Sequence, residues 1–493
     1  MTLPKPTPEQ AAWQDLELTA FAHFGANTFT DREWGEGTED PAIFNPTAFD
    51  ARQWVRALKA GGFKLLILTA KHHDGFCLWP SRWTEHSVKC SPWRGGKGDV
   101  VREVADACRE AGLKFGVYLS PWDRNQPTYG DSPAYNQYFL RQLRELLTDY
   151  GPIAEVWFDG ACGEGPNGKR QEYDWSRFYK LVRRLQPQAL IAICGPDIRW
   201  VGNESGVARE DESSVQVSGS GGAPPAGGAP PAGDPSTALR AGAATAVWHP
   251  AECDVSIRPG WFYHPAEDDR VKSLDELLDI YYKSVGRNSN LLLNVPPDRR
   301  GRLHENDVER LAEFGAEIER RFGRPLAETS GSGDVVELSL RRPTTIDHVI
   351  LMEDIREGER VQGFVVEGLT DGGGASAGSC DGELTPRPSR GRTKVGVKCS
   401  VSHPRPASPS QRERRSDAVL PAQRETGMSN GAWKELCRGE VIGHKRIERF
   451  APVEVSSVRL RFADGAPSAD GAPSAAEPII RKLAVYNAAA ASL

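Results

Sequence analysis

The sequence lacks the features that mark membrane, nucleic-acid-binding and exported proteins. No apolar run reaches the roughly 18 residues needed to span a bilayer. The first residues, "MTLPKPTPEQAAWQD", contain neither the charged nor the apolar part of a signal peptide. With 61 Lys and Arg against 67 Asp and Glu, the chain carries no basic excess that would attract nucleic acid or anionic lipid. We therefore expect no membrane segment and no nucleic-acid partner.

Paired cysteines are also missing. The nine cysteines are scattered, and none forms a C-x-x-C pair. This pattern argues against a zinc ribbon and against a dense disulfide framework, although one or two disulfides would be compatible with a secreted protein. We expect mostly buried free thiols.

Residues 1–325 alternate short strand-like runs with longer amphipathic runs, which is typical of repeated βα units around a parallel sheet. The predicted strands cover Leu16–Phe24, Phe63–Ala70, Leu113–Ser120, Ile153–Gly160, Ala189–Gly195, a stretch near Ala246–Val255, and Asn290–Val295. The predicted helices cover Phe49–Gly62 and Asp99–Gly112, with Asp50 and Asp99 as N-caps, and Ala134–Tyr150, Trp175–Leu185, Leu274–Val285 and Glu305–Phe322. This order predicts an α/β fold, a (β/α)8-like barrel of the TIM type. Because no helix is readable after the fifth strand, an imperfect barrel is also compatible with the pattern.

Residues 326–493 contain strand-like runs without intervening helices, which predicts an antiparallel β-sandwich as a second domain. Low-complexity insertions interrupt both domains, at about 213–245 in the barrel and at about 371–431 and 463–478 in the sandwich. The sandwich could bind sugar or brace the barrel, and we favour bracing.

Polar and aromatic residues follow the predicted barrel strands at their carboxyl ends, where the reactive side chains of such barrels lie. They are His23 after the first strand, Lys71, His72, His73 and Asp74 after the second, Tyr118, Trp122 and Asp123 at the third, Asp159 after the fourth, and Arg199, Trp200 and Glu204 after the fifth. Taken singly, such tryptophans are more often core residues. Burying so many polar groups without a ligand would cost about 1–3 kcal/mol for each unpaired one. The set therefore indicates a pocket.

Two chemistries compete for this pocket. His23, His72, His73, Asp74 and Asp159 could form a divalent metal site of a barrel hydrolase. However, His72 and His73 are adjacent and should diverge in an extended segment, and no H-x-H or H-E-x-x-H spacing is present. The alternative is glycoside hydrolysis by two carboxyl groups, for which Asp159 and Glu204 are suitable.

Several motifs, in order, carry a resemblance to a known family: "HFGANTFTDREWGEG", "ILTAKHHDGFCLWPS", "GVYLSPWDRN", "EVWFDGA", "GPDIRWVGNESG", "PAECDVSIRPGWFYH" and "SVGRNSNLLLNVPPDRRG". Together they resemble glycoside hydrolase family 29, the α-L-fucosidases, and most closely the plant-like branch that cleaves α-1,3 and α-1,4 fucosyl linkages. The resemblance implies an imperfect barrel, a retaining mechanism, and no metal or other cofactor.

The same resemblance implies roles for individual residues. Asp159 matches the family nucleophile, and Glu204 is similar to the acid/base of the plant-like branch. The substrate-binding residues would be His23, His72, His73, Tyr118 and Trp261 around fucose, Glu33 and Trp34 near the rim, and Arg199 and Trp200 beside Glu204. The formal glycosylation sequon at Asn203 overlaps the proposed acid, so we interpret it as a coincidence.

The expected protein is thus an exo-acting retaining α-L-fucosidase that acts on α-1,3/1,4-fucosylated oligosaccharides or glycans. A metal-dependent barrel hydrolase and a non-catalytic fucose-binding protein remain the alternatives. No signal peptide is readable, whereas the family resemblance implies a secreted or vacuolar/lysosomal protein.

Overall fold

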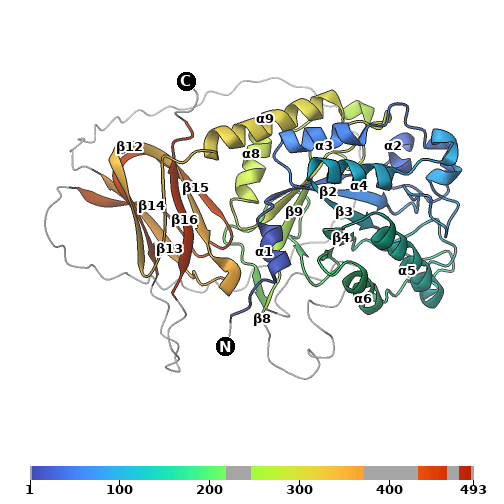
Figure 1. The fold of residues 1–493 in the computed structure, drawn as a ribbon, viewed down its shortest axis with the longest axis horizontal. Helices are drawn as coiled ribbons and strands as arrows, with labels where there is room; N and C mark the ends of the chain where they lie inside the picture. Colours follow the sequence, from blue (N-terminus) through green and yellow to red (C-terminus); the bar gives the residue numbers. More distant parts are fainter. Residues whose placement is uncertain (1–2, 218–245, 371–430, 464–476, 490–493) are drawn as a thin grey trace, which may run out of the picture. The chain divides into compact units, whose positions relative to one another are not determined.

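The computed structural model describes residues 3–217, 246–370, 431–463 and 477–489 (Figure 1). Its first part is an eight-stranded parallel sheet with the order β5-β4-β3-β2-β1-β10-β9-β6. The strands are β1 (Leu18–Ala22), β2 (Leu65–Lys71), β3 (Lys114–Leu119), β4 (Glu155–Phe158), β5 (Leu190–Ile193), β6 (Arg199–Trp200), β9 (Ala251–Ser256) and β10 (Asn290–Asn294). A parallel bridge between Ala192 and Ile198 joins the two ends of this order. The predicted (β/α)8-like barrel is confirmed, in a nearly closed form.

Helices follow most of the barrel strands. They are α1 (Pro8–Gln14), α2 (Ala26–Thr30), α3 (Ala51–Ala60), α4 (Val100–Ala111), α5 (Ser132–Asp149), α6 (Trp175–Leu185), α8 (Leu274–Lys283) and α9 (Glu305–Phe322). The Asp50 and Asp99 side chains accept hydrogen bonds from the third residue of α3 and α4, as expected of N-caps. Between β5 and β6 the described chain contains no helix, since it turns directly through residues 194–198.

Alternation along the strands decides which side chains enter the barrel. On β4, Val156 and Phe158 pack into the large cluster that the helices cover, whereas Trp157 belongs to the inner cluster. The strand therefore directs Glu155, Trp157 and then Asp159 inward. The predicted strand near 246–255 is two strands, a short β8 (Ala246–Trp248) paired with β7 (Val215–Val217), and β9.

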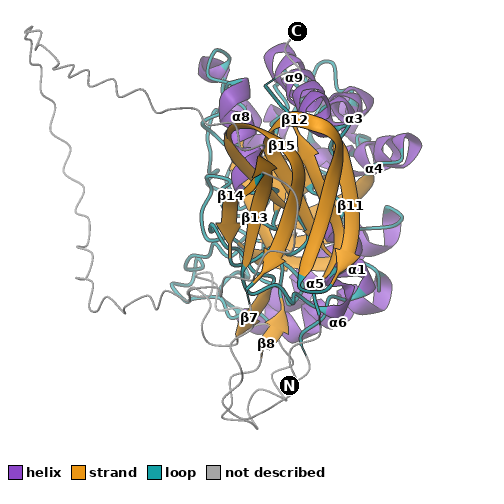
Figure 2. Cartoon of the chain, turned by 90° about the vertical axis from the view of Figure 1, so that its left-hand side faces the viewer, coloured by secondary structure: helices purple, strands orange, loops and turns teal. Residues whose placement is uncertain are grey.

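The second domain is an antiparallel sandwich with its own hydrophobic core, as the sequence predicts (Figure 2). Its strands are β11 (Ala327–Ser332), β12 (Val335–Glu353), β13 (Phe364–Thr370), β14 (Ala432–Gly439), β15 (Arg446–Phe462) and β16 (Ile479–Tyr486), in the order β11-β16-β12-β15-β13-β14. β12 and β15 pair along most of their length, with register shifts after Ser339 and Ile346. Such irregularities bend long strands, and Figure 2 shows both of them curving.

The barrel and the sandwich share buried contacts. Ile350, Ile447 and Tyr486 of the sandwich belong to the main cluster of the barrel. The Ile447 N–H donates to the carbonyl of Gly286 at 3.0 Å, and Lys445 forms a partly buried ion pair with Glu17 at 2.7 Å. These contacts support the interpretation that the sandwich braces the barrel.

Most of the predicted insertions fall outside the described residues. Residues 215–217, at the start of the first insertion, form β7. Cys77, Cys108, Cys194 and Cys253 are buried free thiols, as expected. Among the helices of the described segments, none is long and apolar enough to cross a membrane.

Candidate active site

Asp159 lies directly after β4, at the carboxyl end of the barrel. Its Oδ2 accepts the Tyr118 hydroxyl hydrogen bond at 2.8 Å, and its Oδ1 accepts the Ala161 N–H at 2.7 Å. His73 Nε2 is 3.8 Å from Oδ2. About a quarter of the side chain, 24%, is exposed. Two hydrogen-bond donors thus orient a carboxylate that remains accessible from the barrel mouth.

Three histidines surround this carboxylate. Burial lowers the pKa of His23 to about 4, against the hydrogen bond of its Nδ1 with Asn294. Burial also lowers the pKa of His72 and, despite the opposing charge of Asp159, that of His73. The three imidazoles are therefore neutral at ordinary pH. A neutral imidazole has one donor and one acceptor nitrogen, which suits the recognition of sugar hydroxyl groups.

The expectation that His72 and His73 diverge is wrong. Their ring centroids are 4.1 Å apart, because β2 ends at Lys71 and the following residues form a turn rather than an extended segment. The register with β3 shifts between Thr69 and Lys71. Lys71 instead forms a buried ion pair with Asp123 at 2.8 Å, so these two candidates support the scaffold.

Glu204 lies on the loop after β6 and is exposed. Its Oε2 accepts the Trp261 indole N–H at 3.2 Å. The loop has a defined local shape, because the Asn203 Oδ1 accepts the Ser205 N–H at 3.1 Å and the Asn203 amide donates to the Val207 carbonyl at 2.8 Å. That amide nitrogen is the atom to which a glycan would attach, so its internal hydrogen bond agrees with our interpretation of the sequon.

Trp261 connects Glu204 with the histidines, since its ring lies 5.2 Å from that of His23. Its backbone is held by Glu33, whose Oε2 accepts the Trp261 N–H at 2.8 Å and whose Oε1 accepts the Phe262 N–H at 3.1 Å. His264 Nε2 lies 2.6 Å from Glu33 Oε1. These contacts of Glu33 are to the loop that carries Trp261. Glu33, which was predicted to lie near the rim of the site, therefore supports this loop.

Two more predicted residues differ in where their side chains lie. Trp34 is 54% exposed, and its ring lies 5.5 Å from those of His73 and Trp122, beside the site. Arg199, by contrast, pairs with Glu212 and donates from Nε to the His249 carbonyl at 3.0 Å. Its guanidinium is therefore engaged with the segment around β7 and β8, apart from the side chains around Asp159.

Sequence reasoning did not single out two inward residues, Asp254 on β9 and Asn294 on β10. Asn294 binds His23, and Asp254 accepts the Trp200 indole N–H at 2.7 Å. Both lie at the carboxyl ends of parallel strands, so applying the strand-end rule to the last two strands would have found them.

Below the site, Glu155 and Glu252 form a buried pair of carboxyl groups. The Trp13 indole N–H donates to Glu155 at 2.8 Å and that of Trp157 to Glu252 at 2.9 Å. The remaining oxygen of each, Oε1, receives no donor from the rest of the described chain, and the two side chains hydrogen bond to each other. Burial raises the pKa of both, so the pair holds at least one proton at neutral pH.

Three other glutamates, Glu36, Glu164 and Glu252, would be the alternatives if Glu204 were not the acid, and each is less suitable. Glu252 is enclosed in this pair, and the Glu36 side chain is exposed in an ion pair with Arg32 at 2.8 Å. Glu164 forms a β-bridge with Arg170 in the loop after Asp159. Within the described part of the chain, no group of three or more His, Cys, Asp or Glu side chains has the arrangement of a metal site.

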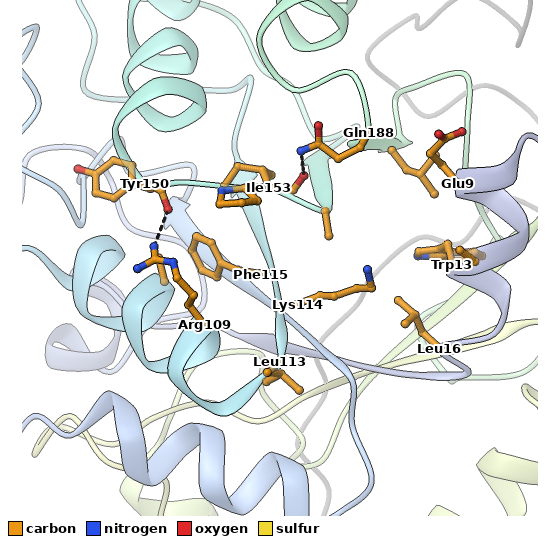
Figure 3. A pocket seen from close by; sticks show the side chains of 16 residues that line it. Glu9, Trp13, Leu16, Arg109, Leu113, Lys114, Phe115, Tyr150, Ile153 and Gln188 are labelled. Atoms are coloured by element: carbon orange, nitrogen blue, oxygen red, sulfur yellow. Dashed lines mark hydrogen bonds between the residues drawn. The ribbon is translucent and has the colours of Figure 1, made fainter.

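A separate cavity of about 440 Å³ lies at the opposite end of the barrel (Figure 3). It is lined mainly by apolar residues at the amino ends of β3, β4 and β5, among them Phe115, Ile153 and Leu190, together with Trp13 of α1. Because Asp159 follows the carboxyl end of β4, this cavity is not the site of the proposed chemistry.

Known proteins resemble this chain in sequence and in fold. The sequence model of the family described as Alpha-L-fucosidase matches residues 19–321. The chain belongs to the alpha-L-fucosidase family. Alpha-L-fucosidase 1 of Arabidopsis thaliana is 47% identical over 332 residues, which are 66% of this chain and 62% of the relative. A relative from Oryza sativa is 50% identical over 63% of this chain and 58% of its own length. The chain therefore spans about three fifths of the length of these plant members of the family.

Solved structures of the alpha-L-fucosidase family have the same fold. A Bacteroides ovatus crystal structure has a TM-score of 0.76 and 45% identity, covering 98% of this chain and 74% of that one. A family 29 fucosidase of Ruminococcus gnavus, solved in complex with fucose, has a TM-score of 0.73 and 28% identity, covering 99% and 95%.

Proposed function

We propose that the protein is an exo-acting, retaining α-L-fucosidase that releases L-fucose from α-1,3/1,4-fucosylated oligosaccharides or glycans. The observation that carries this proposal is the accessible Asp159 carboxylate, oriented by Tyr118 inside a group of neutral histidines. Family membership supports the reaction class. The identity to plant relatives supports the linkage, because the resembled branch is the plant-like one.

The surroundings of Asp159 suit a 6-deoxy sugar. Neutral imidazoles of His23, His72 and His73 can pair with several ring hydroxyls without a competing charge. The rings of Trp261 and Phe262, which flank His23 at 5.2 and 5.5 Å, offer apolar surface for the sugar ring and its methyl group.

In the proposed mechanism Asp159 attacks the anomeric carbon while the glycosidic bond breaks, and Glu204 gives its proton to the departing oxygen. Glu204 then removes a proton from water, which attacks the same carbon and breaks its bond to Asp159. Two inversions give L-fucose with retained configuration. The exposed position of Glu204 supports this role, since an acid/base must reach both the leaving group and water.

The test uses two trisaccharides, one with α-1,4-linked and one with α-1,2-linked fucose. Released fucose is quantified, and its first-formed anomer is identified by NMR. We expect release chiefly from the α-1,4 substrate, as the α-anomer, and none from Asp159→Ala. Preference for the α-1,2 substrate would refute the linkage, a first-formed β-anomer would refute retention, and binding of fucose without turnover would refute catalysis. Loss of activity in EDTA, restored by a divalent metal, would favour the metal-dependent alternative.

A further inference from the structure

Asp254 is a buried carboxyl group at the barrel mouth to which the mechanism assigns no step. It lies near the end of β9 and is 5% exposed. Its Oδ1 accepts the Trp200 indole N–H at 2.7 Å, and its main-chain carbonyl accepts the Gly206 N–H at 3.1 Å. Trp200 and Gly206 stand on either side of Glu204 in the sequence. One strand residue thus binds both ends of the segment that carries the proposed acid/base.

We propose that Asp254 is a positioning residue that fixes the 200–206 segment to the barrel and so determines where the Glu204 carboxyl group can reach. This inference rests on the proposed function, in which Glu204 is the acid/base. Asp254 acts through Trp200 and through the loop backbone.

The segment is tied to β9 at its start, where the Val201 N–H donates to the Glu252 carbonyl at 3.0 Å. Beyond that point, the contacts within residues 202–206 give the turn its shape without fixing its place. Gly202 and Gly206 have positive φ values of 101° and 72°, and Asn203 closes a turn between them. Gly206 is packed so closely on β9 that a Cβ atom there would lie 2.9 Å from Val255. The turn would keep its form if the loop moved as a body, and the hydrogen bonds to Asp254 oppose that movement.

The charge state of Asp254 suits this role. Burial raises its pKa to about 8, the nearby carboxylates of Glu204 and Asp159 add to the rise, and the Trp200 N–H opposes it. The charge of Asp254 in turn raises the pKa of Glu252, which lies one layer below on the same strand. Below about pH 8 a neutral Asp254 therefore offers an acceptor oxygen without adding a further negative charge to the site. Asparagine reproduces this neutral acceptor, which makes Asp254→Asn the matched control for Asp254→Leu.

The first test compares kcat/KM for an α-1,4-fucosylated trisaccharide and for an aryl fucoside whose leaving group needs no protonation. We expect Asp254→Leu to lower kcat/KM for the trisaccharide by between about 10-fold and 100-fold, the range expected when a catalytic group is misplaced by about 1 Å. For the aryl fucoside, whose leaving group does not need the acid, we expect Asp254→Leu to lower kcat/KM by less than about threefold. Asp254→Asn should stay near wild type on both substrates. Equal losses on both substrates for Asp254→Leu, or an Asn variant as impaired as the Leu variant, would overturn the proposal.

Trp200→Phe removes the same hydrogen bond from the other side and tests the route. If Asp254 acts through Trp200, the double variant should be no worse than the poorer single variant. If the kcat/KM losses of the two single variants instead multiply in the double variant, Asp254 does not act through Trp200. Trp200→Phe alone serves as the test if Asp254→Leu does not fold.

Hydrogen–deuterium exchange of the peptide covering residues 200–207 gives a readout that does not depend on activity. We expect faster exchange in Asp254→Leu and unchanged exchange in Asp254→Asn, relative to wild type. Unchanged exchange in the Leu variant would overturn the anchoring role even if the wild type were an active fucosidase. An inactive wild type with the expected exchange pattern would refute the proposed function and leave the anchor standing.

Discussion

The two carboxyl groups of the site are held in very different ways. Asp159 follows a buried strand whose neighbours β3 and β5 fix its register on both sides, and two donors orient its oxygens. Glu204 lies on an exposed loop, where an indole N–H at 3.2 Å is its hydrogen-bond donor. The scaffold of the barrel fixes one carboxyl group, and a few loop contacts fix the other.

This difference follows the separate demands of the two proposed roles. A nucleophile must approach one carbon atom along one line, so a rigid strand end is advantageous. An acid/base must protonate leaving groups of varied shape and later activate water, which an accessible loop allows. Substitutions that affect only one of the two carboxyl groups can therefore separate the roles.

The largest contrast is expected between Asp159→Ala and Glu204→Ala. Loss of the nucleophile should lower kcat/KM by about 10⁴-fold or more for every leaving group, since no intermediate can form. Loss of the acid should cost about 10²–10⁴-fold with sugar leaving groups and little with an activated aryl fucoside. Steady-state kinetics on both substrates measures this contrast.

Azide provides the control for that experiment. It should accelerate turnover of the aryl fucoside by Glu204→Ala and yield a fucosyl azide of retained configuration, because azide needs no general base. Leaving-group-dependent losses in Asp159→Ala, or no azide product with Glu204→Ala, would contradict the assigned roles.

The same difference explains what the sequence could predict. The strand before Asp159 is readable, because an apolar run ends on a carboxylate and a glycine. The rule that reactive groups follow barrel strands then located His23, His72, His73 and Tyr118 as well. Helix caps at Asp50 and Asp99 were equally local and therefore predictable.

Contacts between distant segments were not readable. β6 has only two residues, Arg199–Trp200. A strand this short shows no alternation of apolar and polar residues, so its register with β9 could not be predicted. The proximity of His72 and His73 depends on a turn after β2 that the sequence pattern did not reveal. Trp200 pairs with Asp254, and Glu155 pairs with Glu252. Both contacts join residues far apart in the chain, so no local sequence pattern predicts them.

Tyr118→Phe tests the rigid side of the site with the smallest possible change. It removes the hydroxyl that donates to Asp159 at 2.8 Å and leaves the buried ring. A hydrogen bond to a charged group is worth about 1.5–3 kcal/mol, so kcat/KM should fall by roughly 10- to 150-fold. The loss should be similar for sugar and aryl leaving groups, because it concerns the nucleophile. An unchanged kcat/KM would show that Ala161 and the scaffold alone orient Asp159.

Trp261→Phe tests the loop side in the same way. It retains an aromatic ring beside His23 and removes the indole N–H that donates to the exposed Glu204. Because solvent can replace this hydrogen bond, we expect only about a 3- to 10-fold fall in kcat/KM for the trisaccharide and almost none for the aryl fucoside. A loss as large as that of Tyr118→Phe would mean that the two carboxyl groups depend on their donors equally.

Glu155→Gln should change activity least and the pH dependence of stability most, because Glu155 is fully buried at the start of β4, at the other end of the strand from Asp159. Burial raises the pKa of Glu155 above its ordinary value of 4.5, so the folded state favours the protonated form. The stabilisation is complete below the ordinary value and is lost as pH rises through the raised one. Wild-type Tm should therefore fall between about pH 5 and about pH 8, by roughly 1–2 °C for each kcal/mol lost in a chain of this length. Glutamine supplies a permanent N–H in place of the shared proton and should flatten this slope, whereas the exposed Glu337→Gln should not. Equal slopes for wild type and Glu155→Gln would contradict proton sharing between Glu155 and Glu252.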